Sequence, residues 1–404
     1  TIRQLLDNIN EISEKMKSLH GNAVRDILSA TMGRDVIAFS AGNPDTSTFP
    51  LEAMAEASAE IFASDPQAFQ YGVSEGYEPL RNKIKERLAD KFGMIKEGDE
   101  LITLTGGQQG LDLVARTLCN EGDTVICETP SFVGALNSFR SYGAKLAGIP
   151  MRHDGMDVAL LEEALKSNKN VKFIYIISAF QNPTGITTSL ERRREILALA
   201  KKYGVFILED NPYGELRFSG EDVPTFKALD NDGLVIYCSS FSKILSSGMR
   251  MGYLVAQKEV MRPIILAKQC ADVHTNLFFQ KLCYKILCTY DMDAHIKKIC
   301  ELYGRKCHLM MDMLDKYMPE SVTHTRPEGG LFLWCELPEE RDSAQFAKFA
   351  SECDVFVVPG FAFAADMSAP SHAFRMNYSS PTEAQIEKGV KILAEAAHDF
   401  LATK

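Results

Sequence analysis

Two kinds of motif are missing from this 404-residue sequence. None of its ten cysteines forms a CxxC pair, and none of its eight histidines lies at HxxxH spacing. Those spacings are typical of zinc sites and redox-active thiols, so we expect neither a metal site nor a catalytic cysteine. The cysteines occur instead inside apolar stretches such as "TVICE" and "LFLWCEL", which predicts buried, reduced thiols.

The sequence also lacks long apolar runs and an excess of positive charge. No run of about 20 apolar residues is present, so no membrane-spanning helix is expected. The formal net charge of -10 argues against binding to nucleic acid or to anionic membranes. The first residues, "TIRQLLDNINEISEKMK", mix charged and polar side chains and do not resemble a signal peptide. These absences favour a cytoplasmic protein whose partners are small molecules.

From about residue 100, short apolar runs alternate with amphipathic stretches. Apolar strands that alternate with helices indicate an α/β domain, whose mostly parallel sheet is covered on both faces. In such sheets, ligands bind outside the carboxyl ends of the strands. The predicted strands are 101–105, 124–128, 171–178, 205–210, 234–240 and 252–256, and the predicted helices are 108–119, 131–142 and 189–203.

The pattern changes after about residue 258. A long helix over 294–317, strands over 329–337, 355–359 and 373–379, and a closing helix from about Thr382 predict a smaller α+β domain. The chain is also too long for one ordinary core. We therefore expect a helical segment over 1–45 that joins the smaller domain, a large ligand-binding domain over 46–290, and a small C-terminal domain over 291–404.

Polar residues follow four of the predicted strands. The segments are "GGQQG" (106–110), "AFQNPTG" (179–185), "DNPYG" (210–214) and "SSFSKILSSGMRMG" (239–252). A turn or a solvated loop explains each segment when it is taken alone. Together they place an anion-binding turn, an amide, a carboxylate, a tyrosine, a lysine and an arginine at one edge of one sheet. Pyridoxal phosphate chemistry needs this set: a lysine to carry the cofactor, a carboxylate for its ring nitrogen and donors for its phosphate.

At these segments the chain resembles the class I/II aminotransferases of pyridoxal phosphate fold type I. It is most similar to the group with 2-aminoadipate and multi-substrate aminotransferases and the effector domains of MocR-type regulators. The resemblance runs from about Ala38 to the C-terminus. Its motifs are "NPTG" (182–185), "DNPY" (210–213), "SFSK" (240–243), "GMRMG" (248–252) and "FRMNYS" (374–379).

The resemblance implies a role for each matching residue. Lys243 forms the Schiff base and carries the proton, and Asp210 pairs with the pyridine nitrogen. Phe132 stands where the group usually has a ring-stacking tyrosine, and stacking survives because it needs only the aromatic face. The implied contacts to the ring hydroxyl are Asn182 and Tyr213, and the implied phosphate ligands are Gly107, Gln108, Ser240, Ser242, Arg250 and, from a neighbouring subunit of a homodimer, Tyr71.

The implied activity is transfer of an amino group from an L-amino acid to a 2-oxo acid such as 2-oxoglutarate. Arg375 receives the substrate α-carboxylate, with Gly42 and Asn182 beside it. In similar 2-aminoadipate enzymes, an arginine on an N-terminal helix meets the distal carboxylate. Arg25, in "GNAVRDILSATMG" (21–33), matches that arginine, so 2-aminoadipate or glutamate is the expected donor, with broader specificity left open.

Other activities of the same fold stay open at this point. The motifs position the cofactor and do not decide between transamination, β-elimination, decarboxylation and cyclopropane formation. A MocR-type effector-binding domain is an alternative of another class. Only about forty residues, without a basic recognition helix, precede the matching part, which favours an isolated enzyme.

Overall fold

The computed structural model of the protein describes residues 3–4, 13–17, 19, 27, 29, 31, 33 and 35–403. Its centre is an eight-stranded mixed sheet, in which β8, β7, β6, β3 and β4 are parallel and β9 runs antiparallel to both of its neighbours. The strands, in sheet order, are β2 (Asp99–Thr105), β9 (Met251–Gln257), β8 (Val235–Ser240), β7 (Phe206–Asp210), β6 (Val171–Ile177), β3 (Thr124–Thr129), β4 (Lys145–Arg152) and β5 (Gly155–Met156).

Helices cover both faces of this sheet because its strands are apolar on both sides. Along β6, Phe173, Tyr175 and Ile177 face one core, and Ile174 and Ile176 face the other. The second core is closed by α8 (Val158–Ser167), α9 (Leu190–Tyr203) and α10 (Phe226–Leu229). The first core is closed by α5 (Glu78–Phe92), α6 (Gly107–Leu118), α7 (Val133–Ser141), α11 (Lys258–Asp272) and α12 (Leu277–Thr289).

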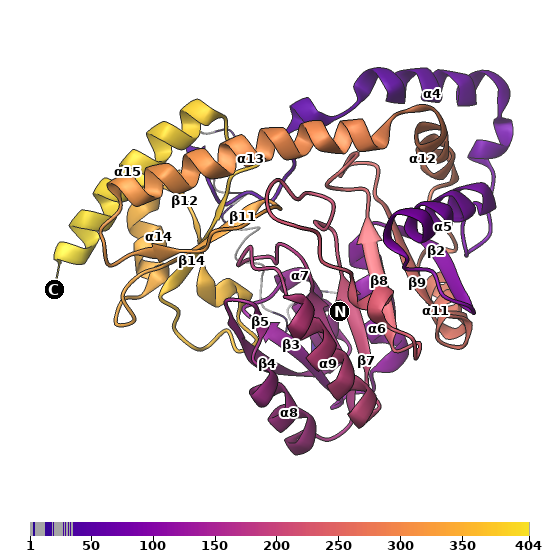
Figure 1. The fold of residues 1–404 in the computed structure, drawn as a ribbon, viewed down its shortest axis with the longest axis horizontal. Helices are drawn as coiled ribbons and strands as arrows, with labels where there is room; N and C mark the ends of the chain where they lie inside the picture. Colours follow the sequence, from indigo (N-terminus) through magenta and orange to yellow (C-terminus); the bar gives the residue numbers. More distant parts are fainter. Residues whose placement is uncertain are drawn as a thin grey trace.

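A smaller four-stranded antiparallel sheet lies beside the large one. Its order is β10 (Thr323–His324), β11 (Phe332–Glu336), β14 (Ala373–Asn377) and β13 (Val358–Pro359). A separate parallel pair joins β1 (Ile37–Ala38) to β12 (Val355–Phe356). The helices here are α13 (Met292–Tyr317), α14 (Ser343–Glu352) and α15 (Glu383–Ala402), and α13 runs from the α12 side of the molecule to α15 (Figure 1).

The helices begin and end where local chemistry allows. Ser189 accepts a hydrogen bond from the Arg192 amide at the start of α9, and Gly204 ends that helix in the left-handed conformation. Thr382 and Gln385 form a capping box at the start of α15. The remaining elements are α2 (Glu14–Lys17), η2 (Thr46–Thr48), α4 (Leu51–Ser64), η3 (Pro66–Phe69) and η4 (Gly360–Phe363).

Two expectations need correction. The run 355–359 is not one strand: β12 pairs with β1, and β13 pairs with β14 in another sheet. The cysteines are all free, but Cys270, Cys288 and Cys353 are exposed, because they lie on the outer faces or ends of helices. No helix in the described part of the chain is long and apolar enough to cross a membrane. The described residues also contain no group of three or more potential metal ligands.

Candidate active site

Lys243 lies in the turn that follows β8, against the loop that follows β1. Its Nζ donates a hydrogen bond to the carbonyl oxygen of Gly42 at 2.8 Å. Burial, together with the positive charges of Arg375 and Arg250, lowers the pKa of Lys243 to about 8. A sizeable fraction of this amine is therefore neutral near neutral pH, which suits a nucleophile or a general base.

Asp210 is the last residue of β7 and is buried. Its Oδ2 accepts a hydrogen bond from the hydroxyl of Tyr175 on β6 at 2.7 Å. Burial raises the pKa of Asp210 to about 7, and none of the groups that act on it is a cation. Since a buried carboxylate needs hydrogen-bond donors or a positive charge, a cationic ligand would stabilise the charged form of this side chain.

The sequence reasoning missed a second buried carboxyl group, that of Glu128 on β3. Its Oε1 accepts hydrogen bonds from the Ile177 amide at 3.0 Å and from Gln181 Nε2 at 3.3 Å, while its Oε2 has no partner in the part of the chain that the structure describes. Burial raises the pKa of Glu128 to about 8. Gln181 also donates to the Pro130 carbonyl at 2.8 Å, so it ties together the loops that carry Phe132 and Asn182.

Arg375 reaches the same region from β14, in the smaller sheet. Its guanidinium donates to Asn182 Oδ1 at 2.9 Å and to the Ser40 carbonyl at 2.9 Å, while its buried Nε has no partner among the described residues. The group lies 4.2 Å from the ring centre of Phe332 and 5.0 Å from that of Phe363. Burial lowers the pKa of Arg375 to about 10, and no carboxylate in the described part of the chain pairs with it.

The predicted anion-binding turn lies where β2 ends and α6 begins. Gly106 has φ +77° and ψ 162°, a conformation open to glycine alone, and Gly107 is the first residue of the helix, where backbone amides are oriented to receive an anion. A side chain on Gly106 would run into the guanidinium of Arg250, and one on Gly107 would contact Ser240. Arg250, Ser240 and the helix start therefore face one space, while Ser242 follows Ser240 in the same turn and donates its amide to Ser240 Oγ at 3.3 Å.

The remaining predicted residues fall into two groups. Tyr213 is buried, its ring meets Phe332 edge-on, and Asn182 lies within hydrogen-bonding range of its hydroxyl. Phe132 is the half-buried residue before α7. The Gln108 side chain is engaged with α7, donating to the Gly134 carbonyl and Ser138 at 2.9 Å, so only its backbone amide can serve an anion at the turn.

One predicted site residue, Tyr71, is not brought into this cluster, and the structure does not describe another, Arg25. Tyr71 lies on the surface, 82% exposed, with its ring edge-on to that of His274. Arg25 lies outside the described residues, but Ile27, two positions later, packs against the cluster that contains Trp334 and Phe363.

The arrangement fits pyridoxal phosphate. The buried amine, which has no carboxylate partner among the described residues, suits an aldehyde. The buried carboxyl group, which has no cation beside it there, suits a protonated ring nitrogen. The helix start with its glycines, beside an arginine, suits a phosphate. The partnerless Nε of Arg375 leaves a further donor for a second anion.

Comparison with known proteins gives the same class. The family "Aminotransferase class I and II" matches residues 34–393, and the chain belongs to that family. Aromatic-amino-acid aminotransferase 1 of Thermococcus litoralis is 39% identical, over 96% of this chain and 94% of that protein. The multiple substrate aminotransferase of Thermococcus profundus has a similar structure, with a TM-score of 0.93 and 37% identity over 98% of this chain and 99% of that one.

A second solved structure bears on the cofactor. The alpha-aminoadipate aminotransferase LysN of Thermus thermophilus, complexed with N-(5'-phosphopyridoxyl)-L-leucine, matches with a TM-score of 0.90 and 33% identity over 98% of this chain and 99% of that one. The fold is therefore pyridoxal phosphate fold type I, as the sequence predicts. The chain is a pyridoxal-phosphate-dependent aminotransferase acting on amino acids and 2-oxo acids.

Proposed function

We propose that this aminotransferase takes its amino group from acidic L-amino acids, 2-aminoadipate or glutamate, accepts aromatic donors more weakly, and returns the group to 2-oxoglutarate. The observation that carries the reaction is the convergence of Lys243, Asp210 and Arg375 from three separate elements. The names of the relatives, which include aromatic, alpha-aminoadipate and multiple substrate enzymes, support a site that admits both acidic and apolar side chains.

Each residue of the cluster has one task in this proposal. Pyridoxal phosphate, when bound, withdraws electrons from the substrate Cα, and the charged form of Asp210 keeps its ring nitrogen protonated. Phe132 packs on the ring face, and Asn182 and Tyr213 bind the ring hydroxyl. The phosphate ligands are the amides of Gly107 and Gln108, the side chains of Ser240, Ser242 and Arg250, and Tyr71 of a second copy.

Lys243 moves the proton. With its pKa lowered to about 8, the amine takes a proton from the substrate Cα, while its hydrogen bond to Gly42 limits its rotation. Arg375 binds the substrate α-carboxylate, which supplies the negative charge that this buried guanidinium lacks. Gly42 and Asn182 line the same space, because one accepts from Lys243 and the other from Arg375.

The acidic preference rests on Arg25. Ile27 contacts the cluster that contains Phe363, and the Phe363 ring lies 5.0 Å from the Arg375 guanidinium. Arg25 itself lies outside the described residues, and its role is part of the proposal. A second arginine at this position would bind the distal carboxylate of 2-aminoadipate or glutamate. An apolar donor leaves Arg25 unused, which is compatible with broad specificity.

The proposed assembly is a homodimer. Phe62 and Phe69 are 68% and 57% exposed, and their rings lie 5.1 Å apart and within 5.6 Å of Phe278. Exposed aromatic clusters of this kind mark protein interfaces, and Tyr71 follows two residues after Phe69 in the chain.

We assign the large domain to 46–290 and the small domain to 291–404, with 1–45 joined to the latter through the pairing of β1 with β12.

The test is a labelling experiment combined with half-reactions. Borohydride reduction of the protein with pyridoxal phosphate, followed by peptide mapping, should label Lys243. Single half-reactions with 2-aminoadipate, glutamate, phenylalanine and leucine, followed by the cofactor absorbance, should rank the acidic donors first. Arg25→Ala should lose about thirtyfold or more for acidic donors only, the cost of removing one partner of a charge pair. A label on another lysine, or an equal loss for leucine, would contradict the proposal.

A further inference from the structure

The loop that contacts Lys243 and Arg375 does so through its backbone. We call residues 39–45 the strap. The Ser40 and Ala41 carbonyls accept hydrogen bonds from Arg375 at 2.9 and 3.4 Å, and the Gly42 carbonyl accepts from Lys243 at 2.8 Å. The positions of Lys243 and Arg375 thus depend on where three consecutive carbonyl oxygens point.

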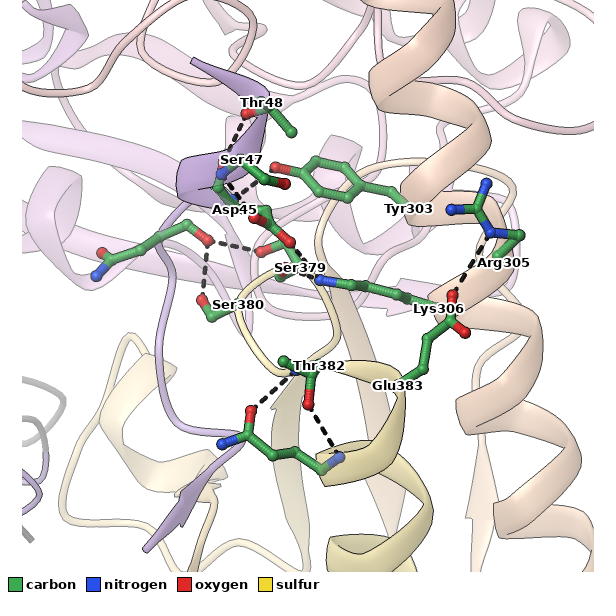
Figure 2. Close-up of polar contacts among 12 residues, drawn as sticks. Asp45, Ser47, Thr48, Tyr303, Arg305, Lys306, Ser379, Ser380, Thr382 and Glu383 are labelled. Carbon is green, nitrogen blue, oxygen red and sulfur yellow. Dashed lines mark hydrogen bonds and ion pairs between the residues drawn. The ribbon is translucent and has the colours of Figure 1, made fainter. Parts of the chain in front are cut away.

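The strap is fixed at both ends. Before it, β1 pairs with β12 in parallel, and the Phe39 carbonyl accepts from the Asn377 amide at 2.8 Å. At the far end, Asp45 forms an ion pair of 2.6 Å with Lys306 of α13, and the Asp45 amide donates to the hydroxyl of Tyr303, one turn earlier on that helix, at 2.9 Å. Figure 2 shows both side chains reaching from α13 to Asp45.

Among the described residues Lys306 donates to two acceptors, one on the strap and one beside its far end. Besides Asp45, its Nζ donates to the Ser379 carbonyl at 2.8 Å, and the Ser379 hydroxyl in turn donates to the strap carbonyl of Asn43 at 2.7 Å (Figure 2). The Lys306 side chain is only 4% exposed. A buried ion pair adds little net stability over an apolar pair, but it does fix geometry, because each charge holds its partner in one place.

We propose that Lys306 is a positioning residue for the transamination site. By holding Asp45, it keeps the strap fixed between β1 and α13. The Gly42 carbonyl then orients the Lys243 amine, and the Ser40 and Ala41 carbonyls orient Arg375. The inference rests on the proposed roles of Lys243 and Arg375. Lys306 touches neither residue and acts through the strap.

The test removes both charges of the pair at once. In Lys306→Met/Asp45→Asn no charge is left unpaired, and the side-chain oxygen of the substituted amide still accepts from the Ser47 amide at the start of η2. The released strap withdraws the Gly42 acceptor from the charged amine, so the pKa of Lys243 falls below about 8 by about one unit. Competitive labelling of the cofactor-free protein with acetic anhydride across pH, with peptide mass spectrometry, measures that pKa.

The variant should also lose about ten- to hundredfold in kcat/KM for the amino donor, because the reacting groups are misplaced. The proposed phosphate ligands should be unaffected, because none of them lies on the strap.

A matched control separates positioning from stability. Lys227 and Asp99 form another buried lysine–aspartate pair, at 2.8 Å. The pair lies where β2 and β8 begin, whereas Lys243 follows the other end of β8. Lys227→Met/Asp99→Asn should lower the thermal midpoint comparably while leaving the Lys243 pKa and kcat/KM as in the parent. Equal changes in the two variants, or no change in the Lys306 variant, would overturn the inference. If the parent protein takes no pyridoxal phosphate on Lys243, the proposed function itself fails, which is a different result.

Discussion

At the residue scale, the charge of Asp210 depends on Tyr175. Burial alone drives the Asp210 carboxyl group toward its neutral form, and the Tyr175 hydroxyl is the one side-chain donor that opposes this in the described residues. A neutral carboxyl group cannot keep a ring nitrogen protonated. We therefore expect Tyr175 to contribute to the proposed acid–base chemistry, although it faces the core of the large domain.

We predict that Tyr175→Phe moves the acid limb of the kcat/KM profile to higher pH. Loss of a hydrogen bond to a charged group raises the pKa of Asp210 by about one unit, and a carboxyl group with a higher pKa loses its charge at a higher pH. Activity then begins to fall about one pH unit earlier on acidification. The pH profile of the half-reaction with glutamate measures this shift.

The control is Tyr142→Phe, which removes a hydroxyl that donates to Asp112 at 2.9 Å, outside the site. That variant should keep the parent's profile. Coinciding limbs in the Tyr175 and parent enzymes would show that this hydrogen bond does not set the charge of Asp210.

Residue chemistry explains which parts of the site could be read from the sequence. Lys243, Asp210 and Asn182 follow apolar strands, and a polar residue at such a position is conspicuous. Tyr175 and Glu128 lie inside strands or near their ends. A single polar residue there is equally compatible with an ordinary position at the edge of the sheet, so the sequence does not mark it as part of a site. The strap was not predicted, because its contribution comes from carbonyl oxygens that every residue carries.

At the element scale, the start of α6 depends on the backbone of Gly106. Any residue with a Cβ is strained at φ +77° and ψ 162°, and the added carbon would displace Arg250 from the anion-binding turn.

Gly106→Ala should therefore cost about 1–3 kcal/mol of stability and weaken pyridoxal phosphate binding at least about tenfold. Gly122→Ala is the matched control, since Gly122 also has positive φ, at +88°, but has open space around it. That variant should lose stability and keep cofactor affinity, as measured by fluorescence titration of the cofactor-free proteins. Equal affinity for pyridoxal phosphate in the two variants would show that the Gly106 turn is not part of the phosphate site.

The elements that were predicted well are those with one strong pattern. The helix over 294–317 agrees with α13 to within two residues, because its apolar spacing continues along the whole helix. The sequence did not indicate that β9 runs antiparallel or that β12 and β13 belong to different sheets. The direction and the partner of a strand are decided by contacts with distant segments, and the residues of an apolar run do not specify those contacts.

At the scale of the whole molecule, the proposed phosphate role of the exposed Tyr71 requires a second chain. We predict that mixing Lys243→Ala with Tyr71→Ala restores activity that neither variant has alone. In a hybrid dimer, one site combines the intact Lys243 of one chain with the intact Tyr71 of the other. Random exchange at equal concentrations makes about half of the dimers hybrids, so about a quarter of all sites are complete.

Mixing Lys243→Ala with Asp210→Asn should restore nothing, because both residues serve the same chain's site. A fully active monomer in sedimentation, or no gain in the first mixture, would contradict the shared site.

The strap has a consequence for how this enzyme tolerates mutation. The strap atoms that contact Arg375 and Lys243 are backbone oxygens, which every residue carries. Ser40 and Ala41 are buried, so few side chains fit at these positions, but a substitution that does fit would leave the hydrogen bonds to Arg375 in place. Insertion or deletion of one residue between Ala38 and Asp45 would instead displace these carbonyls relative to β1 and α13, which fix the two ends of the strap. We therefore expect this segment to tolerate a change of length less well than a change of side chain at positions 40 and 41.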